Sequence, residues 1–264
     1  MKLKRPLETN YNQEEVFPIS IDFSHKQKNK ASPFSSASDD FDFMVEKPID
    51  SNLHKKFGWL EINRIYSSNG YGQAYLLKRP FDILLSIIGL VLSFPIWIVV
   101  AVAIYVEDGA PVIFAQTRLG KDGRKFKFYK FRSMIKNAEA GTGPVWAYKE
   151  DSRITTVGKF LRKTALDELP QLLNILLGQM SFVGPRAERP EFVSEFRKII
   201  PGFNNRLLVR PGLTGVAQVY GHYYTQPRNK LRYDMLYIYN QSFLFDLKLI
   251  FASFWYTFRG KWAT

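Results

Sequence analysis

The residues best suited to chemistry lie in one stretch of the chain, from Arg153 to Pro190. Two adjacent carboxylates, Asp167 and Glu168, follow a run of basic residues that includes Arg162, and a second arginine, Arg186, stands in a Gly/Pro-rich turn. Arginine binds phosphate oxygens through paired hydrogen bonds, and Mg²⁺ is held by one or two carboxylates together with substrate phosphates. These residue types predict a site for a phosphorylated substrate and Mg²⁺, with the two carboxylates as metal ligands.

A plainer interpretation of the two carboxylates is structural. Pro170 is tolerated in the first turn of a helix and Gly178 is typical of a helix end, so we expect a helix from about Asp167 to Gly178. Asp167 would then cap the helix and Glu168 would complement its dipole. A helix N-terminus between two arginines is also a place for a phosphate, and we favour that interpretation.

The composition limits the classes of protein to consider. The 264-residue chain has a formal charge of +13, and the excess lies beyond residue 53, where 30 Lys and Arg face 15 Asp and Glu. Such a surplus suits nucleic acid, an anionic membrane or phosphorylated substrates. The absence of cysteine excludes disulfides and thiolate metal sites, and the three scattered histidines argue against a zinc enzyme. Residues 1–53 are polar without apolar periodicity, which predicts a flexible tail and no secretory signal.

Residues 83–106 form a run of 24 residues without a charge. As a helix this run would be about 36 Å long, enough to cross the hydrocarbon of a membrane. Basic residues flank it on both sides, with Lys78 and Arg79 before it and a cluster from Arg118 to Arg132 after it. Because positive flanks favour the cytoplasm, we expect a helix that enters the membrane and returns, bending at Pro95.

Residues 111–134 predict a β-hairpin, because two β-prone segments flank turn residues at 120–123. Its alternating basic and aromatic residues fit a solvated face. They fit equally a functional strand end, where Lys130 or Arg132 reaches a substrate phosphate. Arg118, in the same hairpin, is a further candidate for phosphate binding.

The rest of the chain is less specific. Residues 188–200 predict an amphipathic helix, and residues 242–262 predict an apolar segment that lies in the membrane interface or packs against the domain. Arg210 precedes a Pro-Gly turn, where a surface role and a substrate role are both open. Residues 141–143 resemble a phosphate loop only weakly, and a mobile loop is the better interpretation.

Five motifs in order give the chain a family resemblance: KRPFD from Lys78, PVIFAQTRLGKDGRKFKFYKFRSM from Pro111, LDELPQLLNIL from Leu166, MSFVGPR from Met180 and VRPGLTG from Val209. Together they resemble the monotopic phosphoglycosyl transferases. These bacterial sugar transferases move a sugar phosphate from a nucleotide sugar to polyprenyl phosphate. The resemblance runs from about residue 78 to about residue 260 and leaves out the first 75 or so residues.

The resemblance implies that Asp167 is the nucleophile, that Glu168 binds Mg²⁺, and that Arg162 and Arg186 bind phosphate. A carboxylate that attacks the sugar-bearing phosphorus would form an acyl phosphate, which polyprenyl phosphate then attacks. The family's Pro-Arg-Pro lacks its second proline here, and a Trp and an Asn of the family are also replaced; these departures fall at Ala187, Val216 and Tyr220.

The sequence therefore predicts an α+β, mostly helical monotopic membrane protein with a re-entrant N-terminal membrane helix, a small β-hairpin and amphipathic interfacial helices. Residues 1–77 would be a flexible cytoplasmic tail and linker, 78–108 the re-entrant helix, and 109–264 the cytoplasmic catalytic domain. The resemblance implies the same re-entrant helix, with its bend at Ser93 and Pro95. Phe94 stands between them, whereas the family often has serine directly before this proline.

We expect the protein to act at the cytoplasmic face of the bacterial inner membrane. It would transfer a sugar 1-phosphate from a UDP-sugar to polyprenyl (undecaprenyl) phosphate and release UMP, through a covalent phosphosugar-aspartate intermediate and with Mg²⁺ as cofactor. Expected partners are the two substrates and inner-membrane lipids but no nucleic acid, and a homodimer is left open. A non-catalytic, basic membrane-anchored scaffold is the alternative. A nucleic-acid binder would explain the charge but not the uncharged run.

Overall fold

The computed structural model describes residues 74–141, 143, 145, 151–221 and 226–259. Of the predicted tail and linker, residues 1–73 lie outside this range. The predicted loop at 141–143 and the end of the apolar segment at 242–262 are only partly inside it.

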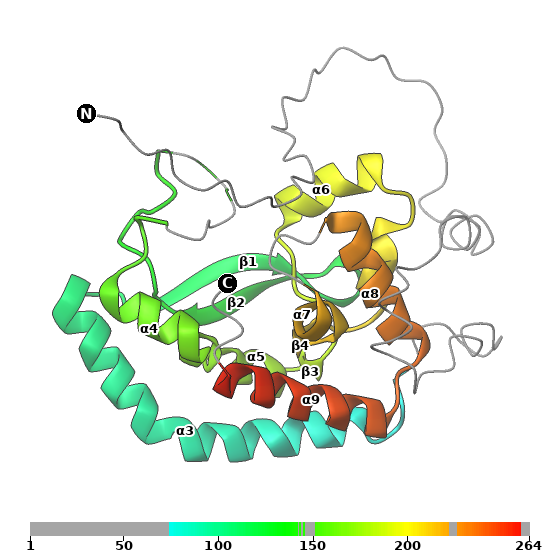
Figure 1. Cartoon of the computed structure of the whole chain (residues 1–264), viewed down its shortest axis with the longest axis horizontal. Coiled ribbons are helices and arrows are strands. Elements are labelled where there is room, and N and C mark those ends of the chain that lie inside the picture. The colour runs from blue at the N-terminus through cyan, green and yellow to red at the C-terminus, as the bar shows by residue number, and fades with distance from the viewer. Residues whose placement is uncertain (1–73, 142, 144, 146–150, 222–225, 260–264) are drawn as a thin grey trace, which may run out of the picture. The chain divides into compact units, whose positions relative to one another are not determined.

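A single long helix, α3 (Lys78–Asp108), opens the described part of the chain and contains the whole uncharged run. Among the residues described, it is the only helix long and apolar enough to cross a membrane. The helix continues through Pro95 and bends along its length, as Figure 1 shows. Gly109, at φ 68°, ends it and donates its N–H to the Tyr105 carbonyl at 2.8 Å. The long apolar helix is confirmed.

The predicted hairpin is also confirmed. Strands β1 (Ile113–Leu119) and β2 (Lys125–Phe131) pair antiparallel, with Phe114 opposite Lys130. The phenylalanine side chains of β2 are buried, whereas the lysines at 125 and 127 are exposed. This alternation follows from the two-residue period of a strand: one face of the hairpin packs on the domain and the other faces solvent.

The segment around the carboxylates differs from the prediction. Helix α4 (Thr156–Thr164) ends where Ala165 adopts a left-handed conformation (φ 55°), and a single 3-10 turn, η3 (Leu166–Glu168), follows. Helix α5 (Gln171–Leu176) begins only after Pro170. The prediction of one helix starting near Asp167 is therefore wrong, because residues 166–172 are joined by 3-10 hydrogen bonds such as that from the Leu169 N–H to the Leu166 carbonyl at 3.3 Å, and Pro170 has no N–H for an α-helical bond. The expected end at Gly178 is confirmed by its positive φ of 79°.

The remaining elements form the larger part of the core. They are β3 (Ser181–Val183), α6 (Pro190–Ile199), the 3-10 segment η4 (Phe203–Leu208), β4 (Gly212–Thr214), α7 (Val216–Tyr220), α8 (Pro227–Tyr239) and α9 (Phe243–Phe258). Strands β3 and β4 pair in parallel. Helix α6 confirms the amphipathic helix expected at 188–200. The fold is thus mostly helical with one small β-hairpin, as the sequence predicts.

Helix α9 confirms that the C-terminal apolar segment packs against the domain, while its place in a membrane interface stays a prediction. Phe245, Leu249 and Ile250 are buried in the core with α7 and α8. The opposite side exposes large apolar side chains, namely Leu244, Phe251, Phe254 and Trp255. Helix α3 likewise exposes most of its apolar residues. Two helices therefore present apolar surface that the described part of the chain does not cover.

Candidate active site

The Asp167 carboxylate lies in the short turn between α4 and α5 and is almost fully buried. Its side chain caps neither η3 nor α5, so the structural interpretation of this residue as a helix cap is wrong. Burial raises the pKa of the Asp167 carboxyl. The charge of Lys130 opposes this rise most strongly and the neighbouring Glu168 adds to it, while Arg162 and Arg186 also oppose it. Asp167 thus lies within the electrostatic reach of three cations.

Lys130 reaches this site from strand β2. Burial lowers the pKa of Lys130 to about 8, and the charge of Asp167 is the strongest influence that opposes this lowering. Asn174 of α5 holds β2 in place, because its Oδ1 accepts from the Tyr129 N–H at 3.0 Å and its Nδ2 donates to the Lys127 carbonyl at 2.7 Å. The strand is therefore fixed to the helix that follows the carboxylates.

Arg162 reaches the site from the last turn of α4. Its Nε donates to Ser133 Oγ at 2.9 Å, and its charge influences the pKa of both Asp167 and Lys130. Helix α4 can approach Ser133 closely only because residue 158 is glycine, where a Cβ would collide with the Ser133 backbone. This close packing sets the direction from which the guanidinium enters.

Arg186 stands on the turn after β3 and binds the second carboxylate. Its Nη2 donates to Glu168 Oε1 at 3.1 Å, and both side chains are partly exposed. The turn is held against β4, where the Gly212 N–H donates to the Pro185 carbonyl at 2.8 Å. A Cβ at Gly184 would collide with the Arg210 backbone, so this approach requires glycine.

Arg118 of β1 adds a further positive charge. Its Nη1 donates to the Ala187 carbonyl at 2.7 Å, and its guanidinium lies 5.1 Å from the centre of the Phe128 ring. Burial lowers the pKa of Arg118 to about 10, and Arg186 is the strongest charged influence in the same direction. Guanidiniums that repel one another at close range are stabilised by an anion between or beside them.

Two predicted substrate ligands make their contacts elsewhere. Arg132 donates to the carbonyls of Asp108 and Gly109 at 3.0 and 2.6 Å and lies 3.1 Å from the Asp108 carboxylate. Arg210 donates through Nε to the Gly178 carbonyl at 2.9 Å. In the structure these arginines tie loops and helix ends together. A substrate role for either one stays a prediction.

The sequence did not single out Asn174, Ser133 or Glu107 as residues that position the site. Asn174 carried a signal, since it is a polar residue inside the apolar run 172–177. Glu107 stands at the end of α3 and caps the start of α4, where it accepts from the Thr156 and Val157 N–H groups at 2.7 and 3.0 Å. Its role depends on a tertiary contact that no local pattern indicates.

The model of the family described as bacterial sugar transferase matches residues 73–260. This chain belongs to that family.

Curated relatives match the same region of this family member. It is 43% identical over 180 residues to the UDP-N-acetylgalactosamine-undecaprenyl-phosphate N-acetylgalactosaminephosphotransferase of Aeromonas hydrophila, which covers 67% of this chain and 42% of the relative. It is 41% identical over 204 residues to the UDP-glucose:undecaprenyl-phosphate glucose-1-phosphate transferase of Klebsiella pneumoniae, covering 75% and 44%. The exopolysaccharide production protein PSS of Rhizobium leguminosarum is 39% identical over 186 residues, covering 67% and 93%. The chain thus spans less than half the length of the first two relatives and nearly all of the third.

The donor set of this sugar transferase family member suits Mg²⁺ only with help from a substrate. Within the described residues, no group of three or more His, Cys, Asp or Glu could hold a metal ion. Asp167 and Glu168 supply two carboxylates, and Mg²⁺ commonly completes its shell with substrate phosphates and water. The residues present therefore fit a cation that binds together with a diphosphate.

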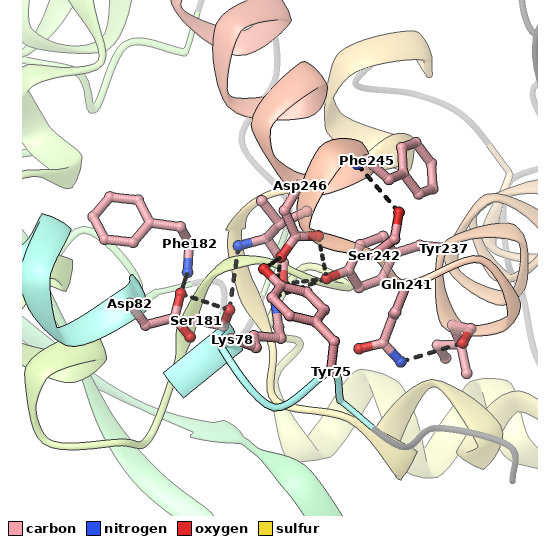
Figure 2. Close-up of polar contacts among 12 residues, drawn as sticks. Tyr75, Lys78, Asp82, Ser181, Phe182, Tyr237, Gln241, Ser242, Phe245 and Asp246 are labelled. Atoms are coloured by element: carbon pink, nitrogen blue, oxygen red, sulfur yellow. Dashed lines mark hydrogen bonds and ion pairs between the residues drawn. The ribbon is translucent and has the colours of Figure 1, made fainter. Parts of the chain in front are cut away.

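The start of α3 is joined to the rest of the domain by a buried polar network, shown in Figure 2. Lys78 Nζ donates to Asp246 Oδ2 at 2.5 Å, to the Tyr237 hydroxyl at 2.9 Å and to the Val183 carbonyl at 3.1 Å. Tyr75 donates to the same carboxylate at 2.9 Å. Burial and the nearby Asp246 charge raise the pKa of both tyrosines above their usual range. The hydroxyls therefore stay protonated, and the lysine charge is fully paired.

The two ends of α3 also bind the two helices that flank the carboxylates. At its start, Arg79 donates to the last carbonyls of α5, those of Ile175 and Leu176, at 2.6 and 2.8 Å. At its end, Glu107 caps α4. Between them, Ser93 Oγ accepts from Trp97 Nε1 at 3.1 Å, close to Pro95. The apolar helix is thus attached to the same domain at both ends.

Proposed function

We propose that this protein transfers a sugar 1-phosphate from a UDP-sugar to undecaprenyl phosphate, or another polyprenyl phosphate, and releases UMP. The observation that carries the proposal is the buried Asp167, which lies beside Glu168 and within reach of the charges of Lys130, Arg162 and Arg186. The printed names of the Aeromonas and Klebsiella relatives describe transfers of this kind. The product would be a polyprenyl-diphospho-sugar, the first membrane-bound intermediate of a glycoconjugate.

In the first step, an Asp167 carboxylate oxygen attacks the sugar-bearing phosphorus of the UDP-sugar. The bond from that phosphorus to the bridging oxygen breaks, and UMP leaves with the bonding electron pair. The aspartyl phosphosugar keeps the sugar 1-phosphate as an acyl phosphate. This step divides one difficult displacement into two easier ones.

In the second step, a phosphate oxygen of the polyprenyl phosphate attacks the same phosphorus. The acyl phosphate bond breaks, Asp167 regains its carboxylate, and a diphosphate linkage forms between the lipid and the sugar. The positive charges around Asp167 stabilise the negative charge that builds on the phosphoryl oxygens in both steps. Lys130 and Arg162 bind the transferred phosphoryl group, and Arg186 and Arg118 bind the phosphate of the departing UMP.

Mg²⁺, held by Glu168 and Asp167 with the substrate diphosphate, would supply charge neutralisation at the phosphate oxygens. Arg186 contacts Glu168 in the structure at 3.1 Å, so this carboxylate has a positively charged partner within the chain. Both partners are partly exposed, which leaves them open to exchange for a phosphate and a cation.

We place the protein at the cytoplasmic face of the bacterial inner membrane, with α3 entering and returning on that side. Three observations support this topology: both flanks of α3 are basic, both ends of α3 bind one domain, and Pro95 lies within its bent course. A helix that crossed the membrane would carry Arg79 and Glu107 to opposite sides, away from one of their partners. The exposed apolar side chains of α9 fit the same membrane interface.

The test is UMP release by the purified full chain from a panel of UDP-sugars. The reactions contain undecaprenyl phosphate and Mg²⁺ in detergent, and matched reactions omit the lipid phosphate. We expect one UDP-sugar to give UMP together with a lipid-linked diphosphate sugar. Turnover with no member of the panel, or a lipid product that retains uridine, would reject the proposal and favour the non-catalytic scaffold.

A further inference from the structure

A second arginine stands behind the turn that carries Arg186. Arg206, in η4, is only 4% exposed, and its Nη2 donates to the Arg186 carbonyl oxygen at 3.1 Å. We propose that Arg206, held by Asp234, is a positioning residue that fixes Arg186 for the phosphate of the uridine nucleotide. This inference rests on the proposed function, in which Arg186 binds that phosphate.

The Arg186 residue is held on one side and open on the other. Its side chain is 46% exposed and faces Glu168, whereas its carbonyl oxygen faces the buried guanidinium of Arg206. The neighbouring backbone contact, from the Gly212 N–H to the Pro185 carbonyl, fixes the residue before it. The hydrogen bond from Arg206 therefore ends on the peptide of the functional residue itself, where a shift would redirect its side chain.

Arg206 is in turn fixed by residues from other elements. Its Nη2 lies 2.8 Å from Asp234 Oδ2 of α8, and its Nη1 lies 3.6 Å from Glu188, two residues beyond Arg186. Its guanidinium also lies 5.1 Å from the centre of the Phe203 ring. A planar fork of donors can serve a carbonyl and two carboxylates together, whereas the compact ammonium of lysine cannot reach all three.

The charges in this group favour a role in geometry rather than in stability. A buried ion pair is weak evidence for stability, since well-packed apolar residues of the same volume do as well or better. Burial raises the pKa of Asp234 to about 6, and Arg206 opposes this rise more than any other charge. At pH 8 the carboxylate is ionised and its pairing with Arg206 is complete, which makes pH 8 the condition for the test.

The decisive experiment measures UMP binding to the full chain in detergent by isothermal titration calorimetry, together with steady-state turnover. Arg206→Lys keeps the positive charge that pairs with Asp234 but loses the planar guanidinium and its several N–H donors. We expect the dissociation constant of UMP and the KM for the UDP-sugar to rise about tenfold or more, with a smaller change in kcat. Arg153→Lys makes the same change in another Arg–Asp pair, in which Asp151 is buried and lies 2.5 Å from Arg153, and should leave UMP affinity unchanged.

A double-mutant cycle separates positioning from a general loss of structure. Arg186→Gln should weaken UMP binding, and adding Arg206→Lys should weaken it no further, because Arg206 acts through Arg186. Multiplicative effects of the two substitutions would overturn the inference. Asp234→Asn provides a second variant should Arg206→Lys not fold, and it should weaken UMP binding in the same non-additive way.

The failure of this inference is distinguishable from the failure of the proposed function. If the wild-type protein turns over a UDP-sugar but Arg206→Lys binds UMP as tightly as wild type, the positioning role is wrong and the proposed function stands. If the wild-type protein neither binds UMP nor releases it from any UDP-sugar, the proposed function fails and the inference fails with it.

Discussion

Replacing Asp167 by Asn exchanges one carboxylate oxygen for an amide nitrogen, and it distinguishes a catalytic role of this residue from a structural one. Asp167 makes no capping hydrogen bond to either helix that it adjoins, so the substitution removes no cap. It removes a buried charge whose burial cost exceeds its attraction to Lys130, since the pKa of Asp167 is raised on balance, and we expect a stability change of about 1 kcal/mol or less. An amide cannot form the acyl phosphate, so turnover should fall about 10⁴-fold or more, which corresponds to about 5.5 kcal/mol in the activation barrier.

The assay pairs UMP release with thermal unfolding of the same preparations. Asp122→Asn is the matched control, because Asp122 is exposed in the hairpin turn at φ 57°, a conformation that Asn also adopts. The control should match wild type in both measurements. Turnover of Asp167→Asn within about tenfold of wild type, or a loss of turnover that only follows a loss of folded protein, would refute covalent catalysis at this residue.

The remaining predictions concern the cations, the packing and the topology. The wild-type rate should fall above about pH 8, where Lys130 loses its proton, and Lys130→Arg should move this limb of the pH–rate profile upward; an unchanged profile would count against a charged Lys130 in the reaction. Gly158→Ala should lower the free energy of unfolding in urea by about 1–3 kcal/mol, since its Cβ would collide with the Ser133 backbone, and an equally stable variant would contradict this. Leu76→Cys and Lys121→Cys, both at exposed positions, should each resist an impermeant thiol reagent from the periplasmic side; labelling of either one would reject the re-entrant topology.

The sequence predicted the elements whose signals are local. The uncharged run became α3, and the turn residues at 120–123 marked the hairpin. The parallel pairing of β3 with β4 was not predicted, because each strand has only three residues and their partners are far apart in the chain. The helix start was misplaced, because residues 166–168 form a 3-10 turn and Pro170 lacks the N–H that an α-helix from Asp167 would need.

In the candidate site, too, residue types could be read from the sequence, whereas contacts between distant segments could not. Charge and residue type were enough to select Asp167, Glu168 and the cations that the structure brings near them. They were not enough to choose between Lys130 and Arg132, because the contacts of Arg132 with the end of α3 depend on the three-dimensional fold. Arg206 was missed for a similar reason: it lies 20 residues from the carbonyl that it holds, and nothing in its local sequence signals that contact.

The attachment of Lys78 has a consequence for the order in which the protein is made. Its partners Val183, Tyr237 and Asp246 follow it by 105, 159 and 168 residues. At about 5–20 residues per second, the ribosome delivers the last of them about 8–34 seconds after the lysine. On the proposed topology, the apolar side chains of α3 hold it in the membrane during this interval, with the lysine head kept in water. Insertion would then precede docking, and the ion pair with Asp246 is among the last contacts that a newly made chain can form.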